Sequence, residues 1–300
     1  MDDDPVLLEV KGGVAVISLN RPDAHNVMGD AADALFFRYL DLVRTDRDVR
    51  VVVWRGNGAS FSTGRDMAEL VGERDGNGDT DRPGNGNGTG TAQDPGVQGD
   101  LGPGFGRRRE RRHGYGSGHL DVLERSHWGT RLLYDFPVPI VCALKGWSLG
   151  TAFERALLCD MRVAAASTRM ALSAVDHGVI PDSAGVAKVY EIGGAALALD
   201  LALTGRHVDA PEALRLGLVS RVVPDDDLDD AVLDLAGAIA ERPPLVTRLV
   251  REHVQALATP PVRDTLGREL VSQTMLLGSH DFEEHRQARA EDREPRYERR

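Results

Sequence analysis

The chain lacks the features that mark several common classes of protein. It has only two cysteines, Cys142 and Cys159, and both lie in apolar runs, so we expect buried free thiols and no disulfide framework. Positive charge is not in excess, because the formal net charge is -11. This charge argues against a general binder of nucleic acid or anionic membranes. No apolar run reaches the roughly 20 residues that a membrane-spanning helix needs.

Several catalytic signatures are also missing. The sequence has no GxxxxGK[ST] phosphate-binding loop, no GxGxxG between a strand and a helix, and no GxSxG nucleophile motif. Three histidines, His113, His119 and His127, do not have the spacing of metal ligands, so we predict no metal site. The first residues, MDDDPVLLEV, are acidic where a targeting segment is basic, which favours a soluble, cytoplasmic protein.

What is present is an alternation of strand and helix patterns. Two short runs, Val6–Val10 and Val14–Leu19, flank a glycine turn and predict a hairpin. Residues 29–44 have a helical pattern, and Val49–Trp54 is typical of a strand buried on both faces. Further strands are predicted at Ile140–Ala143, Met161–Ala165, Met170–Leu172 and Val219–Val223. Further helices are predicted at 185–192, 194–203, 210–216, 226–241, 244–257, 262–277 and 281–291. This alternation predicts an α/β core followed by a helical tail.

The segment Gly72–Gly118 differs in composition from the rest. It has 15 glycines in 47 residues, mixed with Asp, Asn, Arg and Pro. Such a stretch buries too little to offset its ordering entropy, so we predict a disordered insert at 72–118. The basic run Arg107–His113 inside it is either a solvated charge run or a mobile flap that meets phosphates.

Two motifs about eighty residues apart carry the strongest functional signal. They are FSTGRDM at Phe61–Met67 and KGWSLGTAFERALLCDMRVAA at Lys145–Ala165. Each has the pattern of a strand that ends in a small-residue turn and opens a helix. Such a turn leaves backbone N–H groups directed at an anion. The second motif adds a carboxylate, Glu154, among apolar neighbours one turn into its helix, which favours a buried and functional acid.

Together with NRPDAHNVM at Asn20–Met28 and the C-terminal segment SHDFEEHRQARAEDREPRYERR, these motifs resemble the enoyl-CoA hydratase/isomerase (crotonase) family. The resemblance implies an α/β fold, a spiral of ββα units with a helical C-terminal region. It places the core at 1–205 and a trimerisation region at 206–300. It also implies an acyl-CoA thioester as substrate, no separate cofactor, and a homotrimer or a dimer of trimers.

The same resemblance assigns an oxyanion hole to two backbone N–H groups, those of Arg65 and Thr151. A pair of donors of this kind stabilises the negative charge that develops on the oxygen of a thioester enolate. Family members more often have small residues at both positions, so a narrower and more polar pocket is expected here. Gly64, Asp66 and Gly150 flank the donors, and Asp66 is expected to cap or brace its loop.

Glu154 matches one of the two glutamates of the family's hydratases, and the position of the second is Ala174. Asp182, in GVIPDSAG, matches an aspartate that several isomerases of the family use to move protons. From the residues alone, Asp182 is equally a candidate N-cap for the helix that starts near Ser183. Asp176 is expected, with its neighbour His177, at a strand or turn edge.

The resemblance assigns Ala24, His25 and Asn26 to the segment that holds the CoA group, and Arg293 and Arg296 fall where the family often presents basic groups to CoA. The sequence therefore predicts an acyl-CoA enzyme, first of all an enoyl-CoA hydratase. The alternatives are a double-bond isomerase that uses Glu154 with Asp182, a C–C hydrolase, and a non-catalytic scaffold with the same fold.

Overall fold

The computed structural model describes residues 4–70, 117–257 and 261–297. The predicted insert at 72–118 lies outside the described residues, apart from Ser117 and Gly118, which begin a helix. Within the described ranges no helix is long and apolar enough to cross a membrane.

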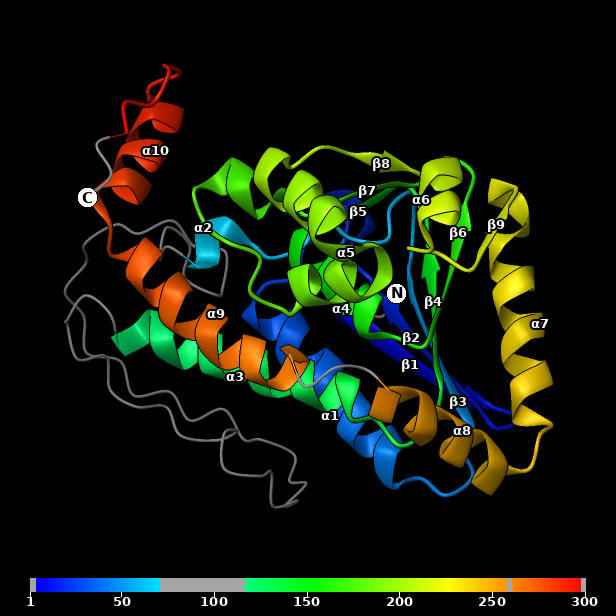
Figure 1. Ribbon diagram of the computed structural model, residues 1–300. Coiled ribbons are helices and arrows are strands. Elements are labelled where there is room, and N and C mark those ends of the chain that lie inside the picture. Colours follow the sequence, from blue (N-terminus) through cyan, green and yellow to red (C-terminus); the bar gives the residue numbers. More distant parts are fainter. Residues whose placement is uncertain (1–3, 71–116, 258–260, 298–300) are drawn as a thin grey trace.

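Two sheets form the framework of the described chain (Figure 1). The larger has the strand order β1-β2-β3-β4-β6-β9, and the smaller has the order β5-β7-β8. Only the β1–β2 pair of the larger sheet is antiparallel in the described chain, whereas the smaller sheet has one parallel and one antiparallel pair. The strands are β1 (Val6–Lys11), β2 (Val14–Leu19), β3 (Val51–Gly56), β4 (Ile140–Leu144), β5 (Trp147–Leu149), β6 (Met161–Ala165), β7 (Arg169–Ala171), β8 (Val208–Asp209) and β9 (Arg221–Val223).

Helices cover both faces of the larger sheet and form the C-terminal region. They are α1 (Asp30–Thr45), α2 (Met67–Leu70), α3 (Ser117–Tyr134), α4 (Gly150–Leu158), α5 (Gly185–Thr204), α6 (Ala210–Leu216), α7 (Leu228–Ala240), α8 (Pro244–Leu257), α9 (Pro261–Leu277) and α10 (His280–Ala290). Short 3-10 turns occur at η1 (Pro22–Ala24), η2 (Ser173–His177) and η3 (Asp225–Asp227). The predicted hairpin is confirmed, with Val6 opposite Leu19, and helices α6 and α8 have the predicted bounds.

The side-chain alternation of the buried strands sorts the core into two layers. Val51 and Val53 of β3 pack with Val232 of α7 on one face. Trp54 points to the other face, because successive residues of a strand alternate. There its ring stacks on Phe36 of α1, with centroids 4.6 Å apart, and meets the edge of Phe61 at 4.9 Å. Since Phe61 begins the first motif, this aromatic cluster anchors the motif to the core.

Of three local predictions, two are confirmed and one needs correction. The helices predicted at 185–192 and 194–203 are confirmed, because Gly194, with a φ of 77° outside the helical region, divides α5 into two helical segments at a kink. The strand predicted from Val219 begins at Arg221. Asp176 and His177, expected at the edge of a strand or a turn, lie at the end of the 3-10 turn η2.

The C-terminal third is more than a helical appendage. Its strands β8 and β9 complete the smaller and the larger sheet, and α7 covers one face of the larger sheet. Helix α9 runs beside α3 and also contacts α5, as Figure 1 shows. The division at residue 205 stays a prediction, while these contacts bring the tail against the elements of the site.

Candidate active site

The two motif turns lie against each other. The backbone of Ser62 accepts a hydrogen bond from the Leu149 N–H at 2.9 Å, so the first turn pairs with the strand that leads into the second. Gly64 has a φ of 88°, and a Cβ added there would lie 2.8 Å from the Leu149 oxygen and 3.3 Å from the Thr151 nitrogen. The close approach therefore requires glycine at position 64.

Arg65 and Thr151, whose backbone N–H groups are the predicted oxyanion donors, line one pocket. Thr151 is in the first turn of α4, where N–H groups have no partner within the helix. The residues on either side of Arg65 bond to Met28, through the Gly64 oxygen at 2.8 Å and the Asp66 nitrogen at 3.0 Å. Because successive N–H groups of an extended backbone point to opposite sides, the Arg65 N–H is directed away from Met28.

Glu154 lies at the same pocket and is only 1% exposed. Its Oε2 accepts hydrogen bonds from the backbone N–H groups of Ser183, at 2.9 Å, and Gly185, at 3.3 Å. Burial, and then the nearby negative charge of Asp182, raise the pKa of Glu154 to about 7. The carboxyl group is therefore fixed in place and close to its point of half-protonation at neutral pH.

Asp182 is paired with an arginine and does not cap a helix, which corrects one of the two sequence readings. The Arg65 guanidinium donates to both of its oxygens, at 3.0 and 3.4 Å. The N-cap of α5 is Ala184, with a φ of 62° and no side-chain cap. The N–H groups at this helix start are instead satisfied by glutamates, so Asp182 is left to form a buried ion pair.

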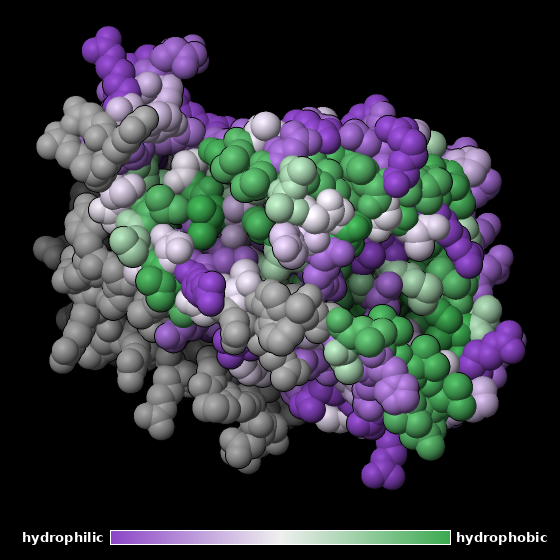
Figure 2. All heavy atoms as spheres, viewed as in Figure 1, coloured by the Kyte–Doolittle hydropathy of each residue, from purple (hydrophilic) through white to green (hydrophobic). Residues whose placement is uncertain are grey.

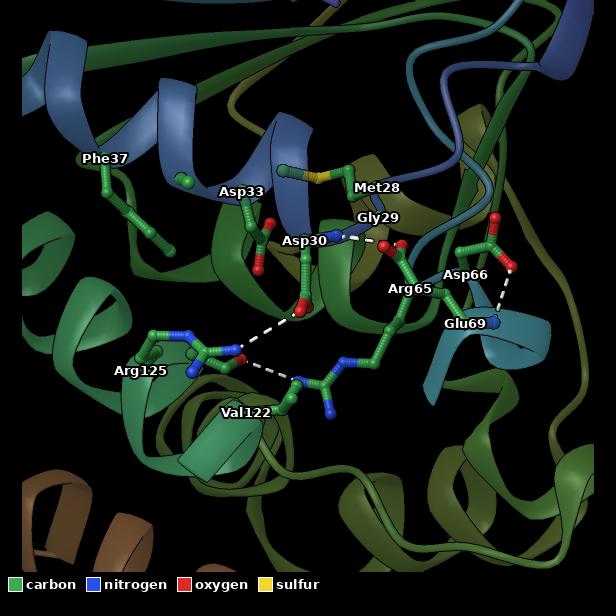
Figure 3. Close-up of a pocket in the computed structure, with 12 residues that line it drawn as sticks. Met28, Gly29, Asp30, Asp33, Phe37, Arg65, Asp66, Glu69, Val122 and Arg125 are labelled. Carbon is green, nitrogen blue, oxygen red and sulfur yellow. Dashed lines mark hydrogen bonds and ion pairs between the residues drawn. The ribbon is translucent and has the colours of Figure 1, made fainter. Parts of the chain in front are cut away.

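The side chain of Arg65 also reaches across to helix α3. Its guanidinium donates to Ser126 of α3 at 2.7 Å, and Arg155 donates to the same hydroxyl at 2.9 Å. Figure 3 shows Arg65 reaching toward α3 from the first turn, beside the ion pair of Arg125 with Asp30. The arginine thus lines two neighbouring pockets and forms part of the wall between them.

A 3-10 turn forms part of the wall of the pocket. Ala174 and His177 of η2 line the pocket, together with Val179 and Ile180. Burial, followed by the charge of Arg289, lowers the pKa of His177. The wall where the resemblance expects a second glutamate is therefore made of a methyl group and a largely neutral histidine.

Four polar residues of the site were not predicted from the sequence. Gln273 of α9 lines the pocket and accepts from the Ile180 N–H at 3.2 Å, and Glu269 accepts from the Ala184 N–H at 3.0 Å. Ser126 and His127 come from α3, and the His127 Nε2 lies 4.0 Å from Asp182. Burial lowers the pKa of His127. No local pattern singles out these residues, because each becomes relevant only through long-range packing.

The predicted CoA segment lies outside this pocket. Asn26 is buried, and its amide donates to the backbone oxygens of Asn57 and Ser60, both at 2.8 Å. His25 is exposed, with its Nδ1 3.1 Å from the Ser60 hydroxyl, and its neighbour Ala24 ends η1. A role for these residues in CoA binding stays a prediction. Asp66 braces its loop as expected, since its carboxylate accepts from the first N–H groups of α2.

Comparison with known proteins agrees with this geometry. The family model of enoyl-CoA hydratase/isomerase matches residues 9–86 and 119–300. The chain belongs to the enoyl-CoA hydratase/isomerase, or crotonase, family and is an acyl-CoA enzyme of that family. Its α/β fold, with two mixed sheets and the helical region α8–α10, is the crotonase fold that the sequence motifs imply.

Particular relatives are distant but cover nearly the whole chain. A carnitinyl-CoA dehydratase of Salmonella paratyphi A is 28% identical over 291 residues, covering 95% of this chain and 94% of the relative. An enoyl-CoA hydratase/isomerase from Pseudoalteromonas atlantica T6c has a TM-score of 0.76 at 24% identity, covering 98% of this chain and 99% of its own. An enoyl-CoA hydratase from Mycobacterium avium subsp. paratuberculosis K-10 has a TM-score of 0.75 at 22% identity, covering 96% and 100%.

Proposed function

We propose that the protein adds water to a 2-enoyl-CoA, or removes it in the reverse direction, with Glu154 as the acid–base group. The observation that carries this proposal is a buried carboxyl group with a pKa of about 7 at the pocket bordered by the two motif turns. A general acid or base works best when its pKa is close to the operating pH. The dehydratase named among the relatives supports the same chemistry.

In this mechanism the Arg65 and Thr151 N–H groups donate to the thioester oxygen. Water attacks the β-carbon while ionised Glu154 takes its proton, and the negative charge moves onto the thioester oxygen as an enolate. Protonated Glu154 then returns that proton to the α-carbon, so no net charge is left. Losing a donor of this kind typically lowers the rate about 100- to 1,000-fold.

One acid must perform both proton transfers because position 174 is alanine. Its pKa near 7 supports this dual role, since both protonation states are populated at neutral pH. Asp182 enters as a fixed negative charge, held by Arg65, that raises the proton affinity of Glu154. Gly64 permits the close approach of the turns, Gly150 supplies a left-handed φ of 51°, and Asp66 braces the first turn.

A second candidate is a double-bond isomerase that uses Glu154 with Asp182, because both carboxylates line the pocket. The ion pair with Arg65 weighs against it, because the guanidinium donates to both oxygens of Asp182 and occupies the positions from which it would accept a substrate proton. A non-catalytic scaffold is disfavoured, because it gives no functional reason to bury the carboxyl group of Glu154 beside the charge of Asp182.

The test is to incubate the protein with crotonyl-CoA and with a 3-enoyl-CoA in isotopically labelled water. Hydration consumes the conjugated substrate and places the labelled oxygen in the product. An isomerase would instead form the conjugated ester from the 3-enoyl-CoA without labelled oxygen. If neither reaction occurs while CoA esters still bind, the result would support the non-catalytic scaffold and contradict the proposal.

The same proposal includes a homotrimer or a dimer of trimers. The support for assembly is an apolar surface over α8, visible as a green region in Figure 2. Its exposed side chains are Leu245, Val246, Leu249, Val250, Val254 and Leu257. Contiguous exposed apolar surface of this kind marks interaction sites. Light scattering would distinguish a trimer from a hexamer, and a monomer would refute this part.

A further inference from the structure

Helix α9 contributes two side chains to the loop that precedes α5. Glu269 and Gln273 are four residues apart and lie on one face of the helix. Gln273 accepts from the Ile180 N–H at 3.2 Å, and Glu269 accepts from the Ala184 N–H at 3.0 Å. Both side chains are almost fully buried, with Gln273 at 2% and Glu269 at 6% exposure. The C-terminal tail therefore holds the loop that forms one side of the active site.

The start of α5 is shared between two carboxylates from different parts of the chain. Three successive N–H groups are involved: those of Ser183 and Gly185 donate to Glu154, and that of Ala184 between them donates to Glu269. The left-handed φ of Ala184, 62°, directs neighbouring N–H groups to different sides. This backbone turn is thus a bridge between the catalytic acid and α9.

Contact between Glu154 and this bridge is tight. A Cβ added to Gly185 would lie 2.4 Å from the Cγ of Glu154, so the side chain of the acid packs directly on the backbone. A displacement of the helix start would consequently move Glu154. Loss of the Glu269 acceptor would leave a buried N–H of Ala184 unsatisfied and favour such a displacement.

We propose that Glu269 is a positioning residue for Glu154, acting through the three backbone N–H groups at the start of α5 that the two carboxylates share. The inference rests on the proposed role of Glu154 and adds to it a second carboxyl group that the sequence does not place in the site. Glu269 does not touch the substrate pocket, so it acts on the chemistry only through Glu154 and the helix start.

The charges around the pair determine how it titrates. Glu154 from α4 and Asp182 from the loop both face Glu269, and burial followed by the charge of Glu154 raises the pKa of Glu269 to about 8. Arg65 opposes the rise at Glu154. From α3 the neighbouring His127 has its pKa lowered by burial, and Lys188 of α5 is engaged with Glu191.

These groups imply that the pair retains one proton over part of the neutral range. The first proton to leave the pair supplies the ionised carboxylate that catalysis needs. When the second proton leaves at higher pH, the pair carries two buried negative charges, and the added charge opposes formation of the enolate. Glu269 thereby limits activity on the alkaline side.

The test compares Glu269→Gln, which keeps an acceptor for the Ala184 N–H, with Glu269→Ala, which removes it. A misplacement of reacting groups by about 1 Å lowers rates up to about 100-fold, so we expect kcat of the alanine variant to fall towards that extent with KM little changed. The glutamine variant should retain most of kcat and lose the decline above pH 8. Gln273→Ala is the matched control, because it removes the other α9 anchor of the loop and should leave the alkaline decline in place.

Full kcat in Glu269→Ala overturns the proposal, and so does an alkaline decline that persists in Glu269→Gln. If the alanine variant does not fold, the pH profile of the glutamine variant decides. A substrate-free measurement separates this inference from the proposed hydratase activity. Glu269→Gln, which removes the carboxylate, should raise the melting temperature more at pH 9 than at pH 6. This difference between the two pH values should be smaller when Glu154→Gln is already present. Additive shifts in the double variant would show that the two groups are not coupled, whether or not any enoyl-CoA is turned over.

Discussion

Replacing Glu154 with glutamine should lower activity and raise stability at the same time. Glutamine has the shape of glutamate and keeps an oxygen to accept from the Ser183 and Gly185 N–H groups. It cannot take or return a proton. Because general acid–base groups contribute about 100- to 10,000-fold, kcat should fall by that order while the binding of a CoA ester is retained.

The stability effect follows from the raised pKa. Folding shifts the pKa of Glu154 from 4.5 to about 7, so the folded state binds the proton more tightly than the unfolded state. Its ionisation therefore begins to destabilise the fold as the pH rises above 4.5, and the effect is complete above pH 7. At about 1.4 kcal/mol per tenfold change in proton affinity, the full cost is about 3 kcal/mol. The neutral glutamine avoids it.

Two assays on one pair of proteins check this reasoning. Turnover of crotonyl-CoA measures the loss of kcat, and urea unfolding at pH 5 and pH 8 measures the free energy of unfolding. The glutamine variant should be more stable than the parent at pH 8, by an amount that shrinks at pH 5. Glu252→Gln on the exposed face of α8 is the control, and it should change neither quantity by much. A Glu154→Gln protein that is fully active, or less stable at pH 8, would refute the argument.

Three further predictions concern the neighbours of Glu154. Asp182→Asn removes a charge that raises the pKa of Glu154, so the acidic limb of the pH–rate profile should move to lower pH while kcat is retained. Loss of all activity at an unchanged melting temperature would instead support proton transfer by Asp182. Arg65→Ala leaves the Asp182 carboxylate buried without its guanidinium partner, so urea unfolding should show that the free energy of unfolding falls by about 3–5 kcal/mol. A change within error would mean that solvent reaches Asp182. Gly64→Ala should lower kcat about 100-fold or more, because a Cβ would press on the Leu149 oxygen beside the proposed oxyanion donors. Gly12→Ala, which has a similarly positive φ and open space around it, is the matched control and should cost stability but not activity.

Much of this protein was readable from local patterns. The hairpin, the buried strand at β3 and the bounds of α6 and α8 follow from short-range periodicity and turn residues, whose energetic preferences lie within a few neighbouring positions. The two glycine turns and the carboxylate at Glu154 were also visible, because a strand–turn–helix junction encodes its own N–H donors. These features indicated the family and singled out Glu154 as a candidate acid.

The tertiary structure decided which groups surround that acid. Asp182 was compatible with a cap or an acid, and it became the partner of Arg65, which is 117 residues away in the chain. Glu269 bonds to a residue 85 positions earlier, and nothing in the pattern of α9 distinguishes it from other polar positions of an amphipathic helix. Burial and neighbouring charge set a pKa, and both depend on which distant segments pack together. The sequence therefore indicates which residue is the candidate acid, while the proton affinity and the position of that residue are properties of the folded chain.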